Sequence, residues 1–161
     1  MRVAESIEIA APPARIWAVV SDPTRVLSFM SGVTRWEIEG SPRTGLGSRC
    51  RVLFRIGAAE IGGLIEFVEW DEGRELAWTS VLGIDQRGRW RLRPTANGHT
   101  RVELRMAYGV AGAGISGWVA ERLAAPTLSG HLRRTLRALK RLIEHEQLRE
   151  AAAARRATRA A

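Results

Sequence analysis

Apolar and polar residues alternate along most of the first two thirds of this chain. Successive side chains of a strand point to opposite faces, so a period of two predicts a strand with one buried face. The alternation predicts seven strands, which span 3–9, 33–40, 48–56, 59–70, 75–82, 86–94 and 100–108. Asn97-Gly98 predicts a tight hairpin before the last strand. Gly62-Gly63 predicts a bulge or a sharp bend within the fourth strand.

Two short helices are predicted between the first and second strands. Pro12 and Pro13 suit the entry of a helix, and Asp22-Pro23 marks its end. The stretch "PTRVLSFM" that follows indicates a second short helix, which ends near Gly32.

The hydrophobic period becomes that of a helix from about Ile115. Large apolar residues recur every three or four positions, which places them on one stripe of a long helix. They are Leu128, Leu132, Leu136, Leu139 and Ile143. Pro126 either kinks this helix or starts it after a shorter helix at 115–124. Residues 149–161 hold no large apolar side chain and are predicted to form a basic, disordered tail.

This order of elements predicts an α+β domain, with one curved antiparallel sheet wrapped around one long C-terminal helix. The 161 residues fit one domain, which we place at 1–148. No apolar run approaches the ~18 residues that cross a membrane, and the N-terminal strand pattern is unlike a secretory signal. Cys50 is the single cysteine and excludes an intrachain disulfide, so a cytoplasmic setting is the expectation.

The net charge of +8 is concentrated at the C-terminal end, because residues 131–161 hold nine basic and three acidic residues. Lys140 is the only lysine among the 25 basic residues. Arginine is the better ligand for phosphates and carboxylates, but a GC-rich coding sequence gives the same bias, and both explanations stay open. The basic end suits peripheral contact with an anionic membrane surface.

Four segments carry a family resemblance. They are "IEIAAPPARIWAVVSDP" at the start, "FVEWDEGRELAW" in the middle, "RLRPTANGHTRVELRM" near the last hairpin and "LRALKRLIE" in the long helix. With them, residues 3–147 resemble the polyketide cyclase/dehydrase family of the START-like (SRPBCC) superfamily. The resemblance implies the helix-grip fold, with a cavity between sheet and helix. It implies no single activity, because the family includes cyclases, aromatases and carriers of lipids and quinones.

A hydrophobic small molecule is therefore the expected partner. If the strands turn their apolar faces inward, the cavity is lined by Trp36, Val52, Phe54, Ile65, Phe67, Trp78, Gln86, Trp90, Leu104, Met106 and Tyr108, and closed by Leu128, Leu132 and Leu136. Each is also an ordinary core residue. Aromatic walls with few polar groups describe a site for an apolar ring or chain.

Catalytic signals are sparse. The resemblance to cyclases makes Tyr108 and His131 weak candidates for an acid or a base, although a helical step of ~100° puts His131 at the edge of the apolar stripe. No histidine has further ligands at metal-binding spacing inside the fold, so no metal and no cofactor are predicted. "GVAGAGISG" at 109–117 lacks the strand–helix–strand context of a dinucleotide loop and is interpreted as an entrance loop. Cys50 is interpreted as a buried structural residue.

"QRGRWRLRP" at 86–94 places arginines at every second position, as in the solvated outer face of a strand. Cross-strand pairing with Glu66, Glu69 and Glu103 is expected. No base-stacking motif or recognition helix accompanies the charge, so nucleic acid is not a predicted partner. The leading hypothesis is a binding protein for a lipid, polyketide or quinone-like molecule. The alternatives are a cyclase or aromatase using the same cavity and, more weakly, a protein or RNA partner on the cationic outer surface.

Overall fold

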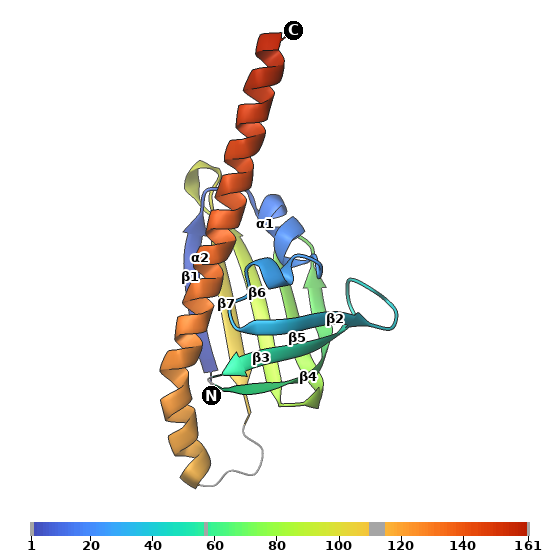
Figure 1. The fold of residues 1–161 in the computed structure, drawn as a ribbon, viewed down its shortest axis with the longest axis vertical. Helices are drawn as coiled ribbons and strands as arrows, with labels where there is room; N and C mark the ends of the chain where they lie inside the picture. The colour runs from blue at the N-terminus through green and yellow to red at the C-terminus, as the bar shows by residue number, and fades with distance from the viewer. Residues whose placement is uncertain (1, 57, 110–114, 161) are drawn as a thin grey trace.

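The computed structural model describes residues 2–56, 58–109 and 115–160, with one curled sheet and one long helix (Figure 1). The strands of the described chain are β1 (Arg2–Ile9), β2 (Val33–Glu39), β3 (Arg49–Ile56), β4 (Ala59–Asp71), β5 (Glu75–Gly83), β6 (Gln86–Pro94) and β7 (Thr100–Tyr108). The helices are α1 (Pro13–Val20), the 3₁₀ turns η1 (Val26–Ser28) and η2 (Ala96–Gly98), and α2 (Ile115–Ala160). The predicted strands are confirmed to within one residue at either end, and the second short helix is the 3₁₀ turn η1.

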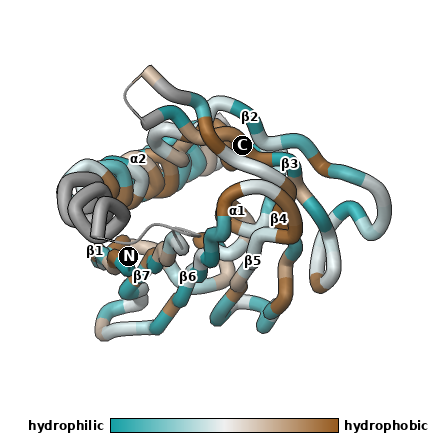
Figure 2. The backbone as a smooth tube through the Cα atoms, turned by 90° about the horizontal axis from the view of Figure 1, so that it is seen from below, coloured by the Kyte–Doolittle hydropathy of each residue, from teal (hydrophilic) through white to brown (hydrophobic). Residues whose placement is uncertain are grey.

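The sheet is antiparallel throughout, in the order β1-β7-β6-β5-β4-β3-β2. β1 lies beside α2, and the strands then curl round until β2 faces back toward the helix (Figure 2). This is the α+β helix-grip fold. It brings β1 and β2, the first and last strands of the sheet, to opposite sides of the space that α2 and α1 fill.

The apolar stripe of α2 faces the sheet, as its spacing predicted. Leu128, Leu132, Leu136, Leu139 and Ile143 are all buried. α1 adds Ile16, Trp17, Val19 and Val20 to the same core. Pro126 lies inside a single helix, and the described part of α2 begins before it.

The glycine pair of β4 lies where two neighbouring strands approach very closely. A Cβ on Gly62 would stand 1.9 Å from the carbonyl oxygen of Val52, and one on Gly63 would stand 1.9 Å from that of Leu82. The register between β4 and β5 shifts immediately afterwards, between Leu64 and Ile65. The predicted irregularity is therefore confirmed, and the crowding explains why both positions are glycine.

The C-terminal end differs from the expected disordered tail, because α2 continues as helix to Ala160 (Figure 1). Alanine and arginine have high helix propensity, so the segment prolongs an existing helix without a packed face. One ion pair, Arg15 with Glu150 at 2.6 Å, joins this segment to the body, and a second, Arg25 with Glu146, lies one helical turn before it.

Candidate functional site

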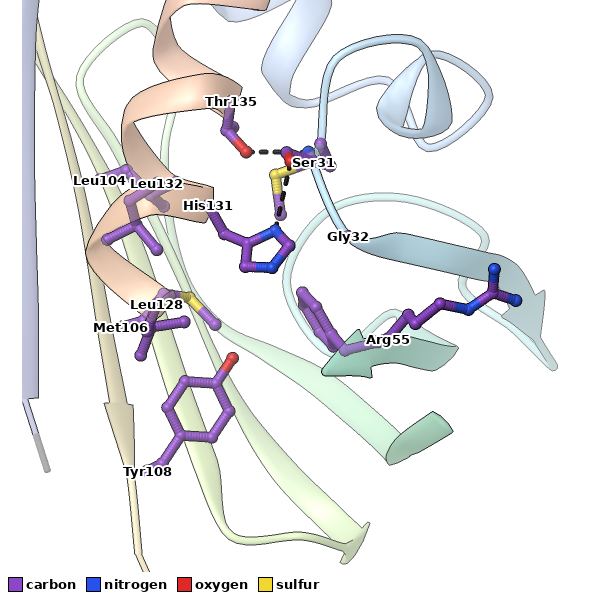
Figure 3. A pocket seen from close by; sticks show the side chains of 12 residues that line it. Ser31, Gly32, Arg55, Leu104, Met106, Tyr108, Leu128, His131, Leu132 and Thr135 are labelled. Carbon is purple, nitrogen blue, oxygen red and sulfur yellow. Dashed lines mark hydrogen bonds between the residues drawn. The ribbon is translucent and has the colours of Figure 1, made fainter. Parts of the chain in front are cut away.

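A small pocket lies between the N-terminal half of α2, the ends of β3 and β7 and the loop before β2 (Figure 3). Its volume is about 20 Å³, close to the ~10–15 Å³ that one water needs. It is lined by Met30, Ser31, Gly32, Phe54, Arg55, Leu104, Met106, Tyr108, Leu128, His131, Leu132 and Thr135. Most of this wall is apolar. Ser31, His131 and Thr135 form a polar corner at α2, while Arg55 and Tyr108 line other sides of the pocket.

The polar corner is a set of hydrogen bonds between α2 and the loop before β2. The amide N–H of Ser31 donates to Oγ1 of buried Thr135 at 2.9 Å. Oγ of Ser31 lies 3.2 Å from Nδ1 of His131 and accepts a hydrogen bond from Nε of Arg134, also at 3.2 Å. His131 and Thr135 are four positions apart, so one helix face presents both.

His131 and the Ser31 hydroxyl share one hydrogen bond, which either group can donate. The hydroxyl has one proton to donate and two acceptor positions, and the Arg134 guanidinium occupies only one of those positions. The contact is therefore compatible with the imidazole proton on Nδ1 or on Nε2. Burial and the nearby Arg134 charge lower the pKa of His131, against the opposing effect of its contact with Ser31. The ring is thus neutral near pH 7, and its Nε2 lies on the side away from Ser31 (Figure 3).

Gly32 makes room for this ring. Its φ is +86°, a conformation that side chains other than glycine rarely adopt. A Cβ at this position would stand 2.7 Å from Nδ1 of His131. The loop can therefore close over the imidazole only because residue 32 has no side chain.

Tyr108 lies at the other side of the pocket, at the end of β7, with its hydroxyl toward the His131 side (Figure 3). Burial raises the pKa of this phenol well above its usual range, so it remains protonated at any physiological pH. The pocket thus places a phenol and a neutral imidazole among Leu104, Met106 and Leu128.

Of the fourteen predicted cavity residues, the structure brings six together in this pocket. They are Phe54, Leu104, Met106, Tyr108, Leu128 and Leu132, and His131 joins them. The aromatic residues Trp36, Phe67, Trp78 and Trp90 line a separate void of about 10 Å³. Phe67 packs edge-on against Trp78, with ring centroids 6.2 Å apart. Val52, Ile65 and Leu136 are fully buried core residues.

Gln86 stands apart from both groups. It is 2% exposed, and its backbone N–H donates to Oγ of Ser80 at 3.1 Å. Among the residues that the structure describes, its side-chain oxygen has no hydrogen-bond partner. Its neighbour across the sheet is Tyr108, so a ligand that reached past Tyr108 would meet an unused acceptor.

Sequence reasoning missed Ser31, Gly32 and Thr135. Ser31 and Gly32 come from a loop with no periodic pattern, about a hundred residues from their partners on α2. Thr135 was findable, because it lies one helical turn after His131 on the same face.

The remaining chemical predictions concern single groups. Cys50 is buried, and burial raises the pKa of its thiol to about 11. Within the described residues, no group of three histidine, cysteine or acidic side chains could hold a metal ion.

Positions 110–114 of the glycine-rich segment lie outside the described residues, so the entrance-loop interpretation stays a prediction. No helix in the described part of the chain combines the length and the apolar character needed to cross a membrane.

The arginines of β6 lie on the outer face, where they are exposed or half-buried, while Trp90 and Leu92 point inward. Arg89 pairs with Glu69 at 2.6 Å, as predicted. The other two predicted acceptors bind different arginines: Glu66 binds Arg49 and Glu103 binds Arg105. Glu75, which was not predicted, binds both Arg89 and Arg91.

The family profile described as "Polyketide cyclase / dehydrase and lipid transport" matches residues 1–144. The chain belongs to this family. The resemblance implied a cavity between the sheet and α2; the pocket there has a volume of about 20 Å³, and a ligand-sized cavity stays a prediction. No curated protein matches the chain.

Solved structures show the same fold at low identity. A protein of Thermus thermophilus is 22% identical, with a TM-score of 0.78 over 91% of this chain and 99% of that one. The Zhui aromatase/cyclase of Streptomyces sp. R1128 is 19% identical, with a TM-score of 0.69 over 89% and 93%. The di-domain ARO/CYC BexL of the BE-7585A biosynthetic pathway is 17% identical, with a TM-score of 0.68 over 89% and 46%.

Proposed function

We propose that this protein encloses a hydrophobic small molecule, of lipid, polyketide or quinone-like character, between the sheet and α2. The observation that carries the proposal is the pocket itself, which has apolar walls and one ordered polar corner. Such a site favours an apolar body that ends in an oxygen acceptor. In the tautomer that carries its proton on Nε2, His131 is the donor for that oxygen.

The ligand must open the pocket before it can enter, because the closed volume of about 20 Å³ holds no organic molecule. Met30 and Met106 line the pocket, and unbranched thioether side chains rearrange readily. Movement of these side chains, together with separation of α2 from β3, would enlarge the site. The pocket can enlarge toward the void beside Trp36, Phe67 and Trp90, because Met30 lines both the pocket and that void.

A cyclase or aromatase activity in the same pocket is the second candidate. Tyr108 and neutral His131 support it, because both can donate a proton to a carbonyl oxygen of a bound chain and stabilise the negative charge that develops there. The names of the Zhui and BexL proteins favour the same chemistry, but these relatives are similar in fold at 19% and 17% identity.

Native mass spectrometry of the freshly purified protein tests the binding proposal. A stoichiometric apolar passenger is expected, and extraction followed by fragmentation identifies its class. Leu132→Trp fills the pocket and should remove the passenger, whereas Arg133→Gln alters the exposed side of the same helix and should retain it. A passenger that binds Leu132→Trp equally well would refute the proposed location.

The cyclase candidate is tested with the identified passenger or a polyketide mimic. A cyclase converts the compound during incubation, and His131→Gln and Tyr108→Phe reduce the rate while binding persists. If the folded wild-type protein binds the compound and returns it unchanged, the conclusion is a carrier function.

A further inference from the structure

A second concave site lies on the outer face of the sheet, on the opposite side from the pocket under α2. It is a groove of about 540 Å³, within the ~300–1,000 Å³ range of small-molecule sites. It is lined by Arg2, Val68, Ala77, Trp78, Thr79, Arg87, Gly88, Arg89, Arg105, Met106 and Ala107. Four of these residues are arginine, and none is acidic.

The register of the sheet builds the groove. Ala107 of β7 pairs with Arg2 of β1 on one side and with Arg87 of β6 on the other. Arg105 lies two positions before Ala107 on the same face, directly opposite Arg89. A methyl group therefore forms the floor between arginines from three strands, and an anion over Ala107 is within reach of several guanidinium groups.

The charges in this groove are only partly neutralised. Carboxylates of Glu69 and Glu75 bind Arg89, and Glu103 binds Arg105. Among the described residues, no carboxylate lies within ion-pair distance of Arg87, which is exposed. Arg89 and Arg105 lie directly opposite each other, and these carboxylates already neutralise much of their charge. Among these three, Arg87 is therefore the arginine with the most charge left for a bound anion.

We propose that this groove binds the phosphate or diphosphate group of a soluble organic ester. A guanidinium binds carboxylate and phosphate oxygens alike through two parallel hydrogen bonds. A phosphate or diphosphate offers more acceptor oxygens and more negative charge than one carboxylate, so it can engage several of these arginines at once. The half-exposed side chain of Val68 offers an apolar surface to the organic part. A polynucleotide fits this face poorly, because Glu75 and Glu103, the cross-strand partners of Arg91, place carboxylates just beyond the groove.

The proposal is tested with inorganic pyrophosphate as the probe, titrated into the full-length protein by calorimetry at two salt concentrations. Saturable binding at one site is expected, and it should weaken as salt rises. Arg87→Gln should raise the Kd at least tenfold, since this arginine holds no ion pair to compensate. Ala107→Leu fills the floor and should abolish binding.

Arg93→Gln is the matched control, because Arg93 is an exposed arginine of the same strand that does not line the groove. Its Kd should equal that of the wild type. Equal weakening by Arg93→Gln and Arg87→Gln would show diffuse charge attraction and overturn the site, as would the absence of saturable binding. Vesicles that contain phosphatidate form the second arm, and binding to vesicles without binding to pyrophosphate would also overturn the proposal. Melting curves establish that each variant is folded, and Arg87→Gln alone decides the test if Ala107→Leu does not fold.

Discussion

His131 is the residue on which the chemistry of the inner pocket depends. Its ring lies 3.2 Å from Oγ of Ser31, and hydrogen bonds with Thr135 and Arg134 hold Ser31 in place. The partially buried imidazole is held neutral by an environment that already contains a guanidinium. It can therefore donate one hydrogen bond into an apolar space without the cost of burying a charge.

The first prediction concerns the titration of His131. Because its pKa is lower in the folded state than the ~6.5 of an unfolded chain, the folded protein binds fewer protons than the unfolded one between these two values. The free energy of unfolding should therefore fall as the pH is lowered through this window, and this contribution is fully present above ~6.5. Nuclear magnetic resonance of the histidine ring gives the pKa, and urea unfolding at several pH values gives the stability.

His131→Gln is the control for this prediction, because it removes the titrating ring and should remove the pH dependence in that window. A pKa of His131 above the ordinary value would contradict the neutral state of the ring near pH 7.

The second prediction concerns Cys50. Its thiol is buried, with a pKa raised to about 11 from 9.0. Iodoacetamide needs the thiolate, so alkylation of the native protein at pH 8 should proceed at least tenfold more slowly than alkylation in denaturing urea. Mass spectrometry follows the reaction. Rapid modification of the native protein at this single cysteine would show that this region of the sheet opens readily.

At the scale of elements, the period of the sequence predicted nearly all of the strands and the stripe of α2. Periodicity reports which face of an element is buried, and Trp90 and Leu92 of β6 show this directly. The polar corner could not be found in the same way. The Ser31–His131 contact joins residues a hundred positions apart, and no local pattern records a meeting that only the complete fold produces.

The outer face shows a similar limit. Alternation predicted that Arg87 and Arg89 face solvent, and they do. Which carboxylate each arginine meets depends on strand register, and bulges displace it: the β4–β5 pairing shifts between Phe67 and Glu69. The groove around Ala107 arises from three strands in register. In the sequence, its only sign is the small residue Ala107, which follows Arg101, Glu103 and Arg105 on the outward-facing side of β7.

The third prediction concerns the glycine pair of β4, where the backbones of β3 and β5 lie very close to β4. Gly63→Ala places a methyl group 1.9 Å from the Leu82 carbonyl oxygen, and neither backbone can move without breaking the sheet ladder. We expect a loss of about 3 kcal/mol or more in the free energy of unfolding. Gly73→Ala is the matched control, because no atom lies within 4 Å of the added methyl group in that turn; it should cost about 1 kcal/mol from backbone strain alone. Equal losses in the two variants, measured by urea unfolding, would contradict the crowding.

At the scale of the whole molecule, two surfaces of the sheet carry different chemistry. The inner face is apolar and meets α2 and α1, and the outer face carries arginines and carboxylates. A ligand enclosed under α2 and an anion held outside would touch successive residues of one strand, since Met106 lines the inner pocket and Ala107 lies on the floor of the outer groove. The two sites are therefore neighbours through the thickness of the sheet, and each can be removed by its own substitution.

The last prediction concerns the end of α2, which projects well beyond the sheet (Figure 1). Leu148 is 69% exposed, and the chain after it contributes one ion pair with the body, Arg15–Glu150, among the described contacts. An exposed ion pair contributes ~0–1 kcal/mol. A protein that ends at Leu148 should therefore fold with a free energy of unfolding within about 1 kcal/mol of the full chain and should retain any passenger of the inner pocket.

Arg15→Gln in the full chain isolates the ion pair and should reproduce whatever small loss the truncation causes. A truncated protein that loses several kcal/mol, or that no longer folds, would show that the helix end stabilises the domain through contacts beyond this pair. If stability and passenger are both retained, the basic helix end is free to act on an anionic membrane surface. That role is then measured directly as the difference in binding to anionic vesicles between the full and truncated chains.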